Sequence, residues 1–527
     1  MLGIDALQEI PSYGQMGLQI ELLNRIAAAL ETTAGTNKGF TALEQSIASQ
    51  FTLMRTGKVY RTRFYRYSVN STSAGTKLDD NAGLVCKPST DATEAQDDYA
   101  QIPVFQWLRC NYTRDASDGF AKPSVLEGLP GFAKEGAVDV GTLHPTFYWN
   151  VEEHDSYYDI IISDTEHTEL GLVPWCEAIR ADGTIMPYWI ESAYQSVTAS
   201  DGLLRSQPGK APAYNQSYNN MIIAYQKKGA GYWGAGIARN TYAILMLAIK
   251  YATKNGQTVF AGCSNYNAQS RCAVAETGVK RVLLASQGPF IVGGCVSVGA
   301  ANGTSTDRGN GSMNSIADRV LVKSIETVTV SGTNYVALNL DIDSTIDTTT
   351  DTYVSTMPQY TGTTDAVIAH HDGSPVSCID AKHTFRIQGQ EYMSGMAIIC
   401  ADTLMEFQAD YSKNVYVAPR GTKHVADAHT GYTLVGNISA TADGKGGDYF
   451  SGDVSFDRAT GSYYPSSVGG GDSVGTGDRV WAGGASTSGL REWYSLGLLW
   501  DGSNGGPCFV SCWNGAGGAN WLCGSCD

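Results

Sequence analysis

Apolar residues recur at helical spacing in two stretches near the start of the chain, residues 16–30 and 40–54. In the second stretch, Leu43, Ile47 and Phe51 follow one another at steps of four and fall on a single apolar face. We therefore predict two amphipathic helices. Their apolar faces either pack on the domain that contains them or serve oligomerisation and attachment to a larger assembly.

From Tyr60 the spacing changes to alternation, which is typical of a half-buried strand. The segment YRTRFYRYSV interleaves Arg61, Arg63 and Arg66 with aromatic rings. Basic and aromatic residues in this arrangement are compatible with nucleic-acid binding, but one solvated strand face explains them as well. The acidic composition of the whole chain favours the solvated face.

Two further helices are predicted in the middle of the chain, over residues 219–227 and 237–251. The Gly-rich segment 229–236 between them, GAGYWGAG, marks a turn or a close approach of the backbone. No Lys-Ser or Lys-Thr follows it, so we do not read it as a phosphate-binding loop.

Alternating apolar residues with Ser-Gly and Gly-Thr-Asn turns predict a small β module over residues 290–343. The next segment, residues 343–356, is rich in Thr and Asp, and we expect it to be a loop or linker.

Residues 479–527 contain many glycines and few charges, and no helical spacing persists in them. Glycine weakens helices and strand interiors but permits tight turns. We therefore predict short strands joined by turns and fastened to a scaffold built elsewhere in the chain. Five tryptophans recur in this segment: Trp481, Trp493, Trp500, Trp513 and Trp521. Such rings suit either a recognition surface or the core of a small β-rich domain.

The composition describes a folded protein, with 43% hydrophobic and 17% charged residues over 527 positions, a length that indicates several domains. A net charge of −16 argues against a general binder of nucleic acid or of anionic membranes. The first residues lack the basic start and apolar run of a signal peptide. The longest apolar run, residues 243–249, is too short to span a bilayer, so we expect no membrane insertion.

The last four cysteines, Cys508, Cys512, Cys523 and Cys526, have the spacing C-x3-C-x10-C-x2-C. This spacing lies near that of a zinc ribbon, and disulfides or free thiols are the alternatives. Six other cysteines are scattered singly, and we interpret them as buried small hydrophobic residues: Cys86, Cys110, Cys176, Cys295, Cys378 and Cys400.

Two further groups of polar residues raise the question of a metal site. His370, His371, Asp372 and His383 lie close together in sequence, but the turn residues around them favour a structural or solvated role. A series of aspartates lacks the glycine and the final glutamate of a calcium-binding EF-hand loop: Asp341, Asp343, Asp347 and Asp351. We predict no metal and no cofactor. We also find no nucleophile elbow, no HExxH and no carboxylate pair suited to glycan cleavage, so we do not expect an enzyme.

The C-terminal segment resembles the variable region of C-type-lectin-fold proteins that phage diversity-generating retroelements diversify. The matching pieces are RVWAGG, REWYSLGLLW (an aromatic turn), DGSNGGPCFV and GGANWLCGS, in that order, and residues 385–419 resemble the start of the same domain. The block from residue 186 to 266 is similar to a segment of structural proteins of tailed phages of gut bacteria. A pair of close cysteines also occurs in formylglycine-generating enzymes, which share this lectin-like fold, but nothing else here matches their active site.

The resemblance implies a multidomain α+β protein with N-terminal helices, mixed α/β and small β modules, and a C-terminal C-type-lectin-like fold. The expected divisions are a helical attachment or oligomerisation segment (1–60), a β-rich domain (61–185), a mixed domain (186–289), a β module with linker (290–380) and a variable receptor-binding domain (381–527). With no export signal in the sequence, we expect a virion protein, made in the host cytoplasm and carried on a tail, neck or head fibre.

The function that this resemblance implies is host adhesion, through a diversified surface that meets a protein or glycan receptor on a bacterial cell. Expected partners also include other virion proteins and further copies of the chain, as a homotrimer. The residues that the resemblance carries over to the contact surface are Tyr494, Trp500, Asp501, Ser503, Asn504, Phe509, Ser511, Trp513, Asn514 and Asn520. Two alternatives remain: a purely structural virion protein that docks on another subunit, and an enzyme acting on glycans or as an oxidase-like relative of the lectin fold.

Overall fold

The computed structural model describes residues 25–26, 41–90, 92–260, 262, 264–265, 269–300, 314–367, 371–374, 384–393, 395–426, 428–438, 448–481, 483, 488–499, 501–512, 514–519 and 523–527. Within these ranges the chain is mostly β-sheet, so the coarse prediction of an α+β protein is confirmed. Its α-helices in the described part are α2 (Ala42–Leu53), α3 (Tyr218–Gln226) and α4 (Ala238–Met246). None of the helices in these ranges is long and apolar enough to cross a membrane.

Two antiparallel sheets come from the first 200 residues. The five-stranded sheet has the order β10 (Val173–Pro174), β8 (Tyr148–Glu153), β9 (Tyr157–Ser163), β1 (Val59–Tyr65) and β2 (Thr76–Asp79). The four-stranded sheet has the order β11 (Tyr188–Ser192), β7 (Asp139–Pro145), β5 (Leu108–Arg114) and β6 (Ala121–Leu126).

Two larger sheets follow. The six-stranded sheet has the order β14 (Ser270–Arg271), β21 (Thr352–Thr356), β17 (Cys295–Ala300), β18 (Ala317–Val330), β19 (Thr333–Leu340) and β16 (Arg281–Leu284). The eight-stranded sheet has the order β26 (Thr433–Ile438), β25 (Lys413–Val417), β24 (Ala397–Phe407), β31 (Leu490–Ser495), β32 (Val510–Ser511), β30 (Arg479–Trp481) and β27 (Asp448–Phe450), and β33 (Cys523–Gly524) also pairs with β24.

Short ladders and helical turns connect these sheets. The two-stranded ladders are β3 (Cys86–Lys87) with β4 (Gln96–Asp97), β12 (Ser196–Thr198) with β13 (Leu204–Ser206), β15 (Glu276–Val279) with β20 (Ile346–Thr348), β22 (Phe385–Ile387) with β23 (Gln390–Tyr392), and β28 (Val454–Asp457) with β29 (Ser462–Pro465). The 3-10 turns are η2 (Asp98–Gln101), η3 (Pro103–Phe105), η4 (Thr168–Leu170), η5 (Cys176–Ala178), η7 (Gly256–Thr258), η9 (Thr363–Ala366) and η11 (Gly502–Asn504).

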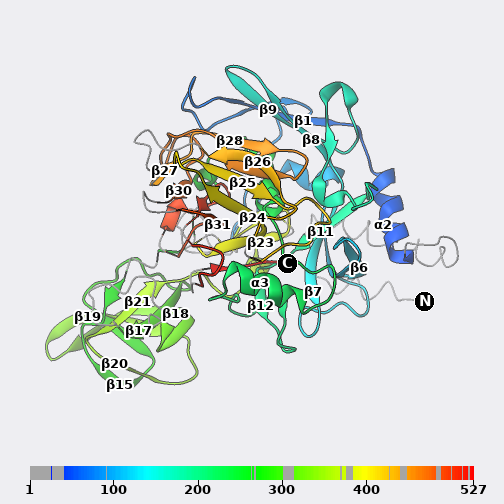
Figure 1. Cartoon of the computed structure of the whole chain (residues 1–527). Coiled ribbons are helices and arrows are strands. Elements are labelled where there is room, and N and C mark those ends of the chain that lie inside the picture. The colour runs from blue at the N-terminus through cyan, green and yellow to red at the C-terminus, as the bar shows by residue number, and fades with distance from the viewer. Residues whose placement is uncertain are drawn as a thin grey trace.

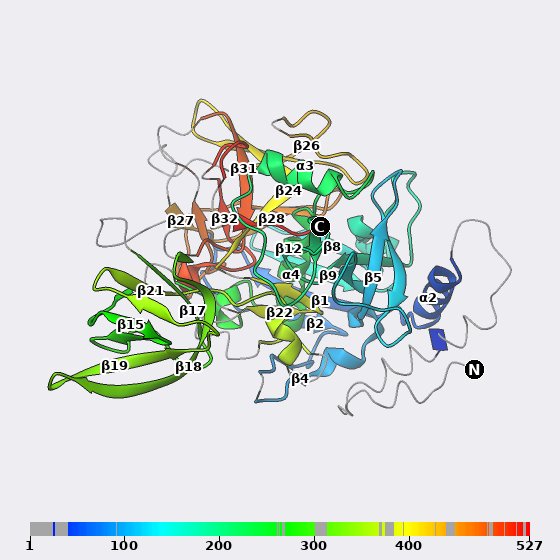
Figure 2. The ribbon, with the colours of Figure 1, turned by 90° about the horizontal axis from the view of Figure 1, so that it is seen from below.

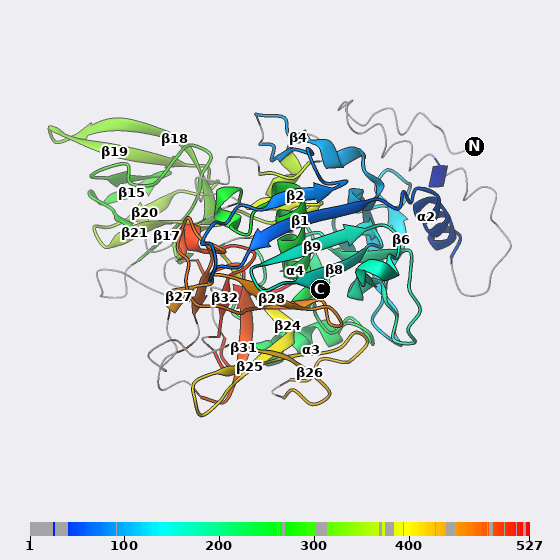
Figure 3. The ribbon, with the colours of Figure 1, turned by 90° about the horizontal axis from the view of Figure 1, so that it is seen from above.

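The six-stranded sheet, with β15 and β20, forms a lateral module, and the other sheets together form what we call the main body. All three ribbon views show the six-stranded sheet, with β15 and β20, to one side of the other sheets, and α2 at the opposite side (Figures 1, 2 and 3). The eight-stranded sheet lies between this module and the N-terminal sheets. The C-terminal strands are therefore built into the main body and do not project from it.

Helix α2 confirms the second of the two predicted N-terminal helices. Its first turn is held by a capping box, in which Thr41 and Glu44 exchange hydrogen bonds. Ile47 and Phe51 are buried against the four-stranded sheet, in one cluster with Leu108 and its neighbours. This apolar face thus packs on the domain that contains it, which is the first of the two alternatives predicted for it. Most of the other predicted helix, residues 16–30, lies outside the described residues.

The arginines of β1 lie on a solvated face of the five-stranded sheet, where they pair with carboxylates. Arg61 contacts Glu152 and Asp159 at 2.9 and 3.1 Å, and Arg63 contacts Asp159 at 2.8 Å. Arg66 pairs with Glu153. Because acidic side chains already neutralise these cations, the strand lacks the free positive charge that nucleic-acid binding requires.

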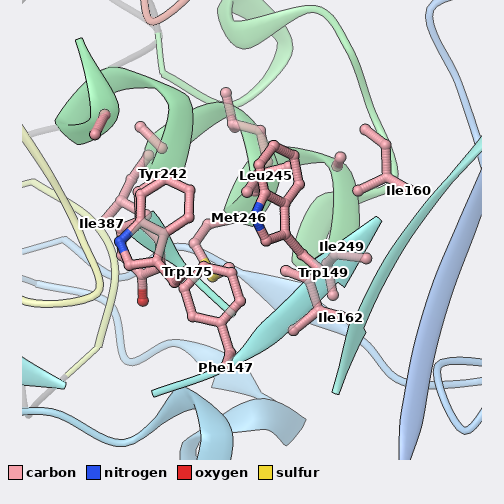
Figure 4. Close-up of a cluster of buried hydrophobic side chains, with 14 of the residues drawn as sticks. Phe147, Trp149, Ile160, Ile162, Trp175, Tyr242, Leu245, Met246, Ile249 and Ile387 are labelled. Carbon is pink, nitrogen blue, oxygen red and sulfur yellow. The ribbon is translucent and has the colours of Figure 1, made fainter. Parts of the chain in front are cut away.

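The middle of the chain contributes the helices at the centre of the largest core. Helix α4 continues directly into a π-helix, η6 (Leu247–Tyr251), so the prediction of a helix over residues 237–251 is confirmed. Figure 4 shows side chains of this helix among the rings of Phe147, Trp149 and Trp175. The Phe147 and Trp175 rings stack at 5.1 Å, and the Trp189 ring meets Tyr242 edge to face at 4.8 Å.

The expected linker over residues 343–356 contains two strands, β20 and β21, and the loop prediction is wrong there. Thr352, Val354 and Ser355 of β21 are buried, since this strand lies between β14 and β17 in the six-stranded sheet. The β-branched residues of the segment favour strand, and pairing on both sides outweighed its polar composition.

The largest apolar cluster draws on residues far apart in the chain, from Tyr60 through Trp149, Tyr242 and Phe385 to Leu496. Four of the five expected divisions therefore contribute to one core. The proposed boundaries at 60, 185, 289 and 380 themselves stay predictions.

A buried lysine holds several of these segments together. The Lys250 Nζ donates to Asp372 Oδ2 at 2.7 Å, to Gln388 Oε1 at 2.8 Å and to Asp97 Oδ2 at 3.2 Å. His371 Nδ1 lies 3.4 Å from the same Asp97 oxygen. Burial alone would lower the pKa of Lys250, but the two carboxylates raise it well above its ordinary value. His371 and Asp372 therefore have structural roles, while His370 and His383 lie outside the described residues.

Removing the Lys250 cation should destabilise the main body strongly. We expect Lys250→Met to lower the free energy of unfolding by about 3–5 kcal/mol, because Asp97 and Asp372 then remain buried without a partner cation. Urea unfolding followed by tryptophan fluorescence measures the change. Lys58→Met, at an exposed position, is the matched control and should change stability by less than about 0.5 kcal/mol. Equal unfolding curves for the two variants would contradict the role of Lys250.

Candidate functional site

The C-terminal segment supplies four short strands to the eight-stranded sheet, as predicted. β31 pairs antiparallel with the long strand β24, and β32 lies between β31 and β30. β33 pairs parallel with the start of β24. The piece REWYSLGLLW begins as the strand β31 and turns only after it, at Leu496, which has φ 75°. Upstream strands therefore provide the scaffold, and the glycine-rich segment adds strands of two to six residues to it.

Four of the expected contact residues are buried inside the chain. Tyr494 and Phe509 are each 1% exposed and belong to one apolar cluster. Ser511 is buried in β32. Asp501 is also buried: its Oδ2 accepts from the Leu498 backbone N–H at 2.7 Å. These side chains hold the sheet and its turn together, so in this structure they are not presented to solvent.

Of the remaining expected residues, Ser503 is exposed, while Asn504 and Asn514 are half-buried. Asn514 also has a structural contact, because its Nδ2 donates to the Tyr494 hydroxyl at 2.6 Å. Trp500, Trp513 and Asn520 lie outside the described residues.

Apart from Ser503, the exposed described residues of this region lie in two neighbouring segments, residues 488–491 and 514–519, which we call the display edge. Ser488, Gly517 and Ala519 are exposed within it. The two segments are joined where the Glu492 N–H donates to the Asn514 carbonyl at 3.2 Å. Of the expected contact residues, Asn514 is the one described member of this edge, because the resemblance carried over scattered polar and aromatic positions and none of Ser488, Gly517 and Ala519. The signal was present in the runs of small residues, ASTSG and NGAGGAN.

Two buried carboxyl groups lie in the C-terminal part of the eight-stranded sheet, one just before β30 and one within β31. Asp478 Oδ2 accepts from the Cys508 backbone N–H at 2.7 Å, and Glu492 accepts from the Tyr494 hydroxyl. Burial raises the pKa of each carboxyl to about 8. Gly506 is packed so closely on Asp478 that a Cβ there would lie 2.3 Å from its Oδ1. This part of the sheet therefore tolerates little change.

The cysteines do not gather at one point in the described part of the chain. Cys508 and Cys512 pack in the cluster of Trp493, whereas Cys526 belongs to the largest core. Burial raises the pKa of Cys512 and of Cys526 to about 12, which keeps both thiols protonated. The side chain of Cys523 lies outside the described residues. Among the scattered cysteines, Cys110, Cys176, Cys295 and Cys400 are buried free thiols as predicted, Cys86 is half-buried, and Cys378 falls outside the described ranges.

Within the described ranges, one group of side chains could bring three metal-ligand atoms together: Glu152, His154 and Asp159. Arg61 donates to both carboxylates of this group, at 2.9 and 3.1 Å. A guanidinium thus lies where a cation would bind. In the predicted aspartate series, Asp347 accepts from the Gly278 N–H and Asp351 pairs with Arg271.

Comparison with known proteins adds no family to this description. No protein-family model matches the chain, and no curated protein matches it.

The two buried carboxyl groups predict that stability falls as pH rises. Their folded pKa of about 8 lies above the unfolded value of about 4. The folded state therefore keeps protons that the unfolded chain loses, so the stabilisation is complete below pH ~4 and is lost as pH rises to about 8. Each group should contribute a fall of about 1.4 kcal/mol per pH unit within that range.

Urea unfolding between pH 5 and 8.5 tests this. Asp478→Asn and Glu492→Gln should each show a shallower loss of stability with pH than the unaltered chain. Glu94→Gln, at an exposed carboxyl, is the matched control and should follow the unaltered chain. A common slope for all four proteins would rule out both carboxyls as the titrating groups.

The position of the thiols predicts that no metal supports the fold. Dialysis against a strong chelator should leave the unfolding temperature unchanged, because Cys508 and Cys512 lie in one cluster and Cys526 in another, so these thiols cannot ligate one ion together. Tight binding of one equivalent of zinc, found by elemental analysis, would overturn this assignment.

Proposed function

We propose that the chain is a phage virion adhesion protein that presents the display edge to molecules on a bacterial surface. The observation that carries the proposal is the separation of roles in the C-terminal segment. Of its described rings, Trp493, Tyr494 and Phe509 are buried in the sheet and Trp481 is half-buried, whereas its exposed positions are small residues in turns. A surface that must accept many sequences needs this separation, since exposed turns change at little energetic cost and buried rings do not.

The local space around the glycines supports the same separation. A Cβ at Gly517, on the display edge, would meet no atom within 4 Å, so larger side chains fit there. At Gly506, which precedes β32, a Cβ would collide with Asp478. Substitution is therefore sterically free at Gly517 and restricted at Gly506.

The order of the strands is compatible with the resemblance to diversified C-type-lectin-fold proteins. The piece RVWAGG contains β30, REWYSL contains β31, DGSNGGPCFV ends in β32, and the closing piece contains β33. The quoted pieces thus coincide with the C-terminal strands of one sheet. We propose on this basis that the C-terminal domain is lectin-like and that its turns are diversified by a retroelement.

Adhesion by this surface would be non-covalent and multivalent. A small exposed edge makes few contacts, so useful binding to a cell requires several copies on one particle. We propose a homotrimer attached to other virion proteins, with residues 1–60 as the attachment or oligomerisation segment. The receptor is a protein or a glycan of the bacterial surface.

The genome that encodes the chain offers a direct test of diversification. A near-copy of the coding sequence for the last residues, differing at adenines and lying beside a reverse-transcriptase gene, is the expected finding. With no such copy, a purely structural virion protein that docks on another subunit becomes the better explanation.

Blocking the display edge should abolish adsorption without unfolding the chain. We expect Ser488→Lys with Gly517→Lys to reduce adsorption of virions to host cells at least tenfold, because both positions are exposed and long cationic side chains obstruct the surface. A thermal melt of the purified variant should match that of the unaltered chain. Normal adsorption by this folded variant would refute the display edge as the receptor surface.

Two further variants complete that experiment. Ser344→Lys with Thr345→Lys places the same charges at exposed positions of the lateral module and should leave adsorption unchanged. Trp493→Ala should instead destabilise the domain by about 3–5 kcal/mol, because its ring is fully buried. Loss of adsorption in the module variant would point to a general effect of charge.

A further inference from the structure

A cavity of about 60 Å³ lies on the main body, apart from the display edge. Its walls come from the glycine-rich loop between α3 and α4, from Asp402 of β24, from residues 418–424 after β25, and from Arg114 of β5. One water molecule needs about 10–15 Å³ by the same measure, so the space corresponds to roughly four to six waters. It accommodates a small polar group or one edge of a larger molecule.

An irregularity in β24 positions the acid in this cavity. β24 pairs with β31 at Ile398–Ile399 and again at Leu404–Glu406, with a shift of register between. Residues 400–403 therefore bulge from the ladder, and the Ala401 N–H donates to the Ala235 carbonyl at 3.0 Å. The bulge brings Asp402 against the glycine-rich loop, where a Cβ on Gly236 would lie 1.7 Å from Asp402 Oδ2.

Within the described ranges, Asp402 forms hydrogen bonds through one of its two carboxylate oxygens. Its Oδ1 accepts from the Ile237 N–H at 3.0 Å and from Thr403 Oγ1 at 2.6 Å. No donor from another described residue pairs with Oδ2. The residue is 8% exposed, so this oxygen is an acceptor held inside the cavity wall.

His424 provides a second unused acceptor. Its Nδ1 lies 2.7 Å from the Trp233 carbonyl, which can only accept, so Nδ1 carries the hydrogen. Burial lowers the pKa of His424 to about 4, so the ring is neutral at pH 7 and its Nε2 has a free lone pair. No described residue pairs with that Nε2. The Trp233 ring, half-buried, also lines the cavity, 6.2 Å from the His424 ring.

The charges around the cavity disfavour a charged ligand of either sign. Arg114 pairs with Asp527 at 3.1 Å, and Arg420 pairs with Glu177, so both guanidinium groups have a carboxylate partner. An ammonium group would still enter beside two guanidinium groups. A carboxylate or phosphate would meet Asp402 and the nearby acid Glu191. Neutral groups that donate hydrogen bonds are repelled neither by the two guanidinium groups nor by the two acids.

We propose that this cavity binds one edge of a neutral sugar residue, with adjacent hydroxyl groups donating to Asp402 Oδ2 and His424 Nε2 and the ring carbons lying near Trp233. Two hydroxyl groups fit the available space, whereas a whole hexose does not, so the rest of the sugar remains at the mouth. The inference rests on the proposed function, in that it names a glycan as a ligand of the adhesion protein. It adds a second site, formed by residues outside the display edge.

The test uses the full-length chain and four soluble probes. Methyl α-d-glucopyranoside and methyl α-d-mannopyranoside are neutral, d-glucosamine carries an ammonium group, and d-glucuronate carries a carboxylate. Saturation-transfer NMR and titration should show saturable binding of at least one neutral glycoside, at least tenfold tighter than binding of the two charged sugars. No saturable binding, or tighter binding of a charged sugar, would overturn the proposal.

Two variants connect the binding to the named acceptors. In Asp402→Asn the amide oxygen stays with the Ile237 N–H, so an amide NH₂ replaces the acceptor in the cavity. His424→Leu removes the other acceptor. Each variant should weaken neutral-glycoside binding at least tenfold. Asp410→Asn, on the exposed turn after β24, is the matched control and should bind normally.

Folding and function are separated by two more measurements. A thermal melt shows whether each variant is folded. If either Asp402→Asn or His424→Leu has unfolded, glycoside binding by the other variant decides whether the cavity is the binding site. Undiminished binding by a folded Asp402→Asn or His424→Leu would overturn the proposal. Adsorption of virions to cells is measured separately. If the chain binds glycosides but virions do not adsorb, only the adhesion function is refuted. If adsorption depends on the display edge but no glycoside binds, only the sugar site in the cavity is refuted.

Discussion

The buried ammonium group of Lys250 is the interaction on which the main body depends. It lies at the π-helical end of the central helix, 1% exposed, and contacts Asp97 from the first part of the chain and Asp372 from the second. A buried cation must be neutralised and fully hydrogen-bonded, or its desolvation outweighs the gain from pairing. Three acceptors satisfy this one: two carboxylate oxygens and the amide oxygen of Gln388. The cation thereby fixes the positions of segments that apolar packing alone would leave free to slide.

The buried acidic side chains of the eight-stranded sheet are accommodated in a different way. Asp478 and Glu492 have no cationic partner among the described residues, and burial raises the pKa of both. Near neutral pH they favour the protonated form, in which a carboxyl group can lie in an apolar environment at lower cost. The central helix is thus held by a complete ion cluster around Lys250, while Asp478 and Glu492 are buried as carboxyl groups that favour the neutral form. The stability contributed by Asp478 and Glu492 therefore depends on pH.

The sequence predicted the regular elements with the strongest periodicity. The apolar face of Ile47 and Phe51 predicted α2, and the aromatic alternation after Tyr60 predicted β1. The residue pattern gave the wrong secondary structure where pairing with distant strands determined it. The Thr-rich segment that forms β21 within the six-stranded sheet is the example. For the candidate site, the resemblance to a variable lectin-type region led us to expect Tyr494 and Phe509 on the surface. Their burial depends on partners such as Met396 and Leu404, far away in the sequence, which local composition does not reveal.

The cavity was beyond sequence reasoning for a related physical reason. Asp402 and His424 are ordinary residues in the sequence, and neither belongs to a motif. Their unused acceptors face one space only because β24 bulges and the glycine-rich loop fits against the bulge. The glycine-rich segment 229–236 was recognised as a place of close backbone approach, but the sequence does not say which residue it approaches.

The strand β24 connects the two proposed surfaces and also separates them. On one side it pairs with β31, whose first residues belong to the display edge, and at its bulge it holds Asp402 in the cavity. Changes on exposed turns are absorbed locally, because turn side chains without buried contacts transmit little strain to a paired strand. The bulge is anchored separately, by hydrogen bonds to Ala235 and from Ala418. A diversified edge and a constant cavity can therefore coexist on one strand, so that altering the first leaves the acceptor geometry of the second intact.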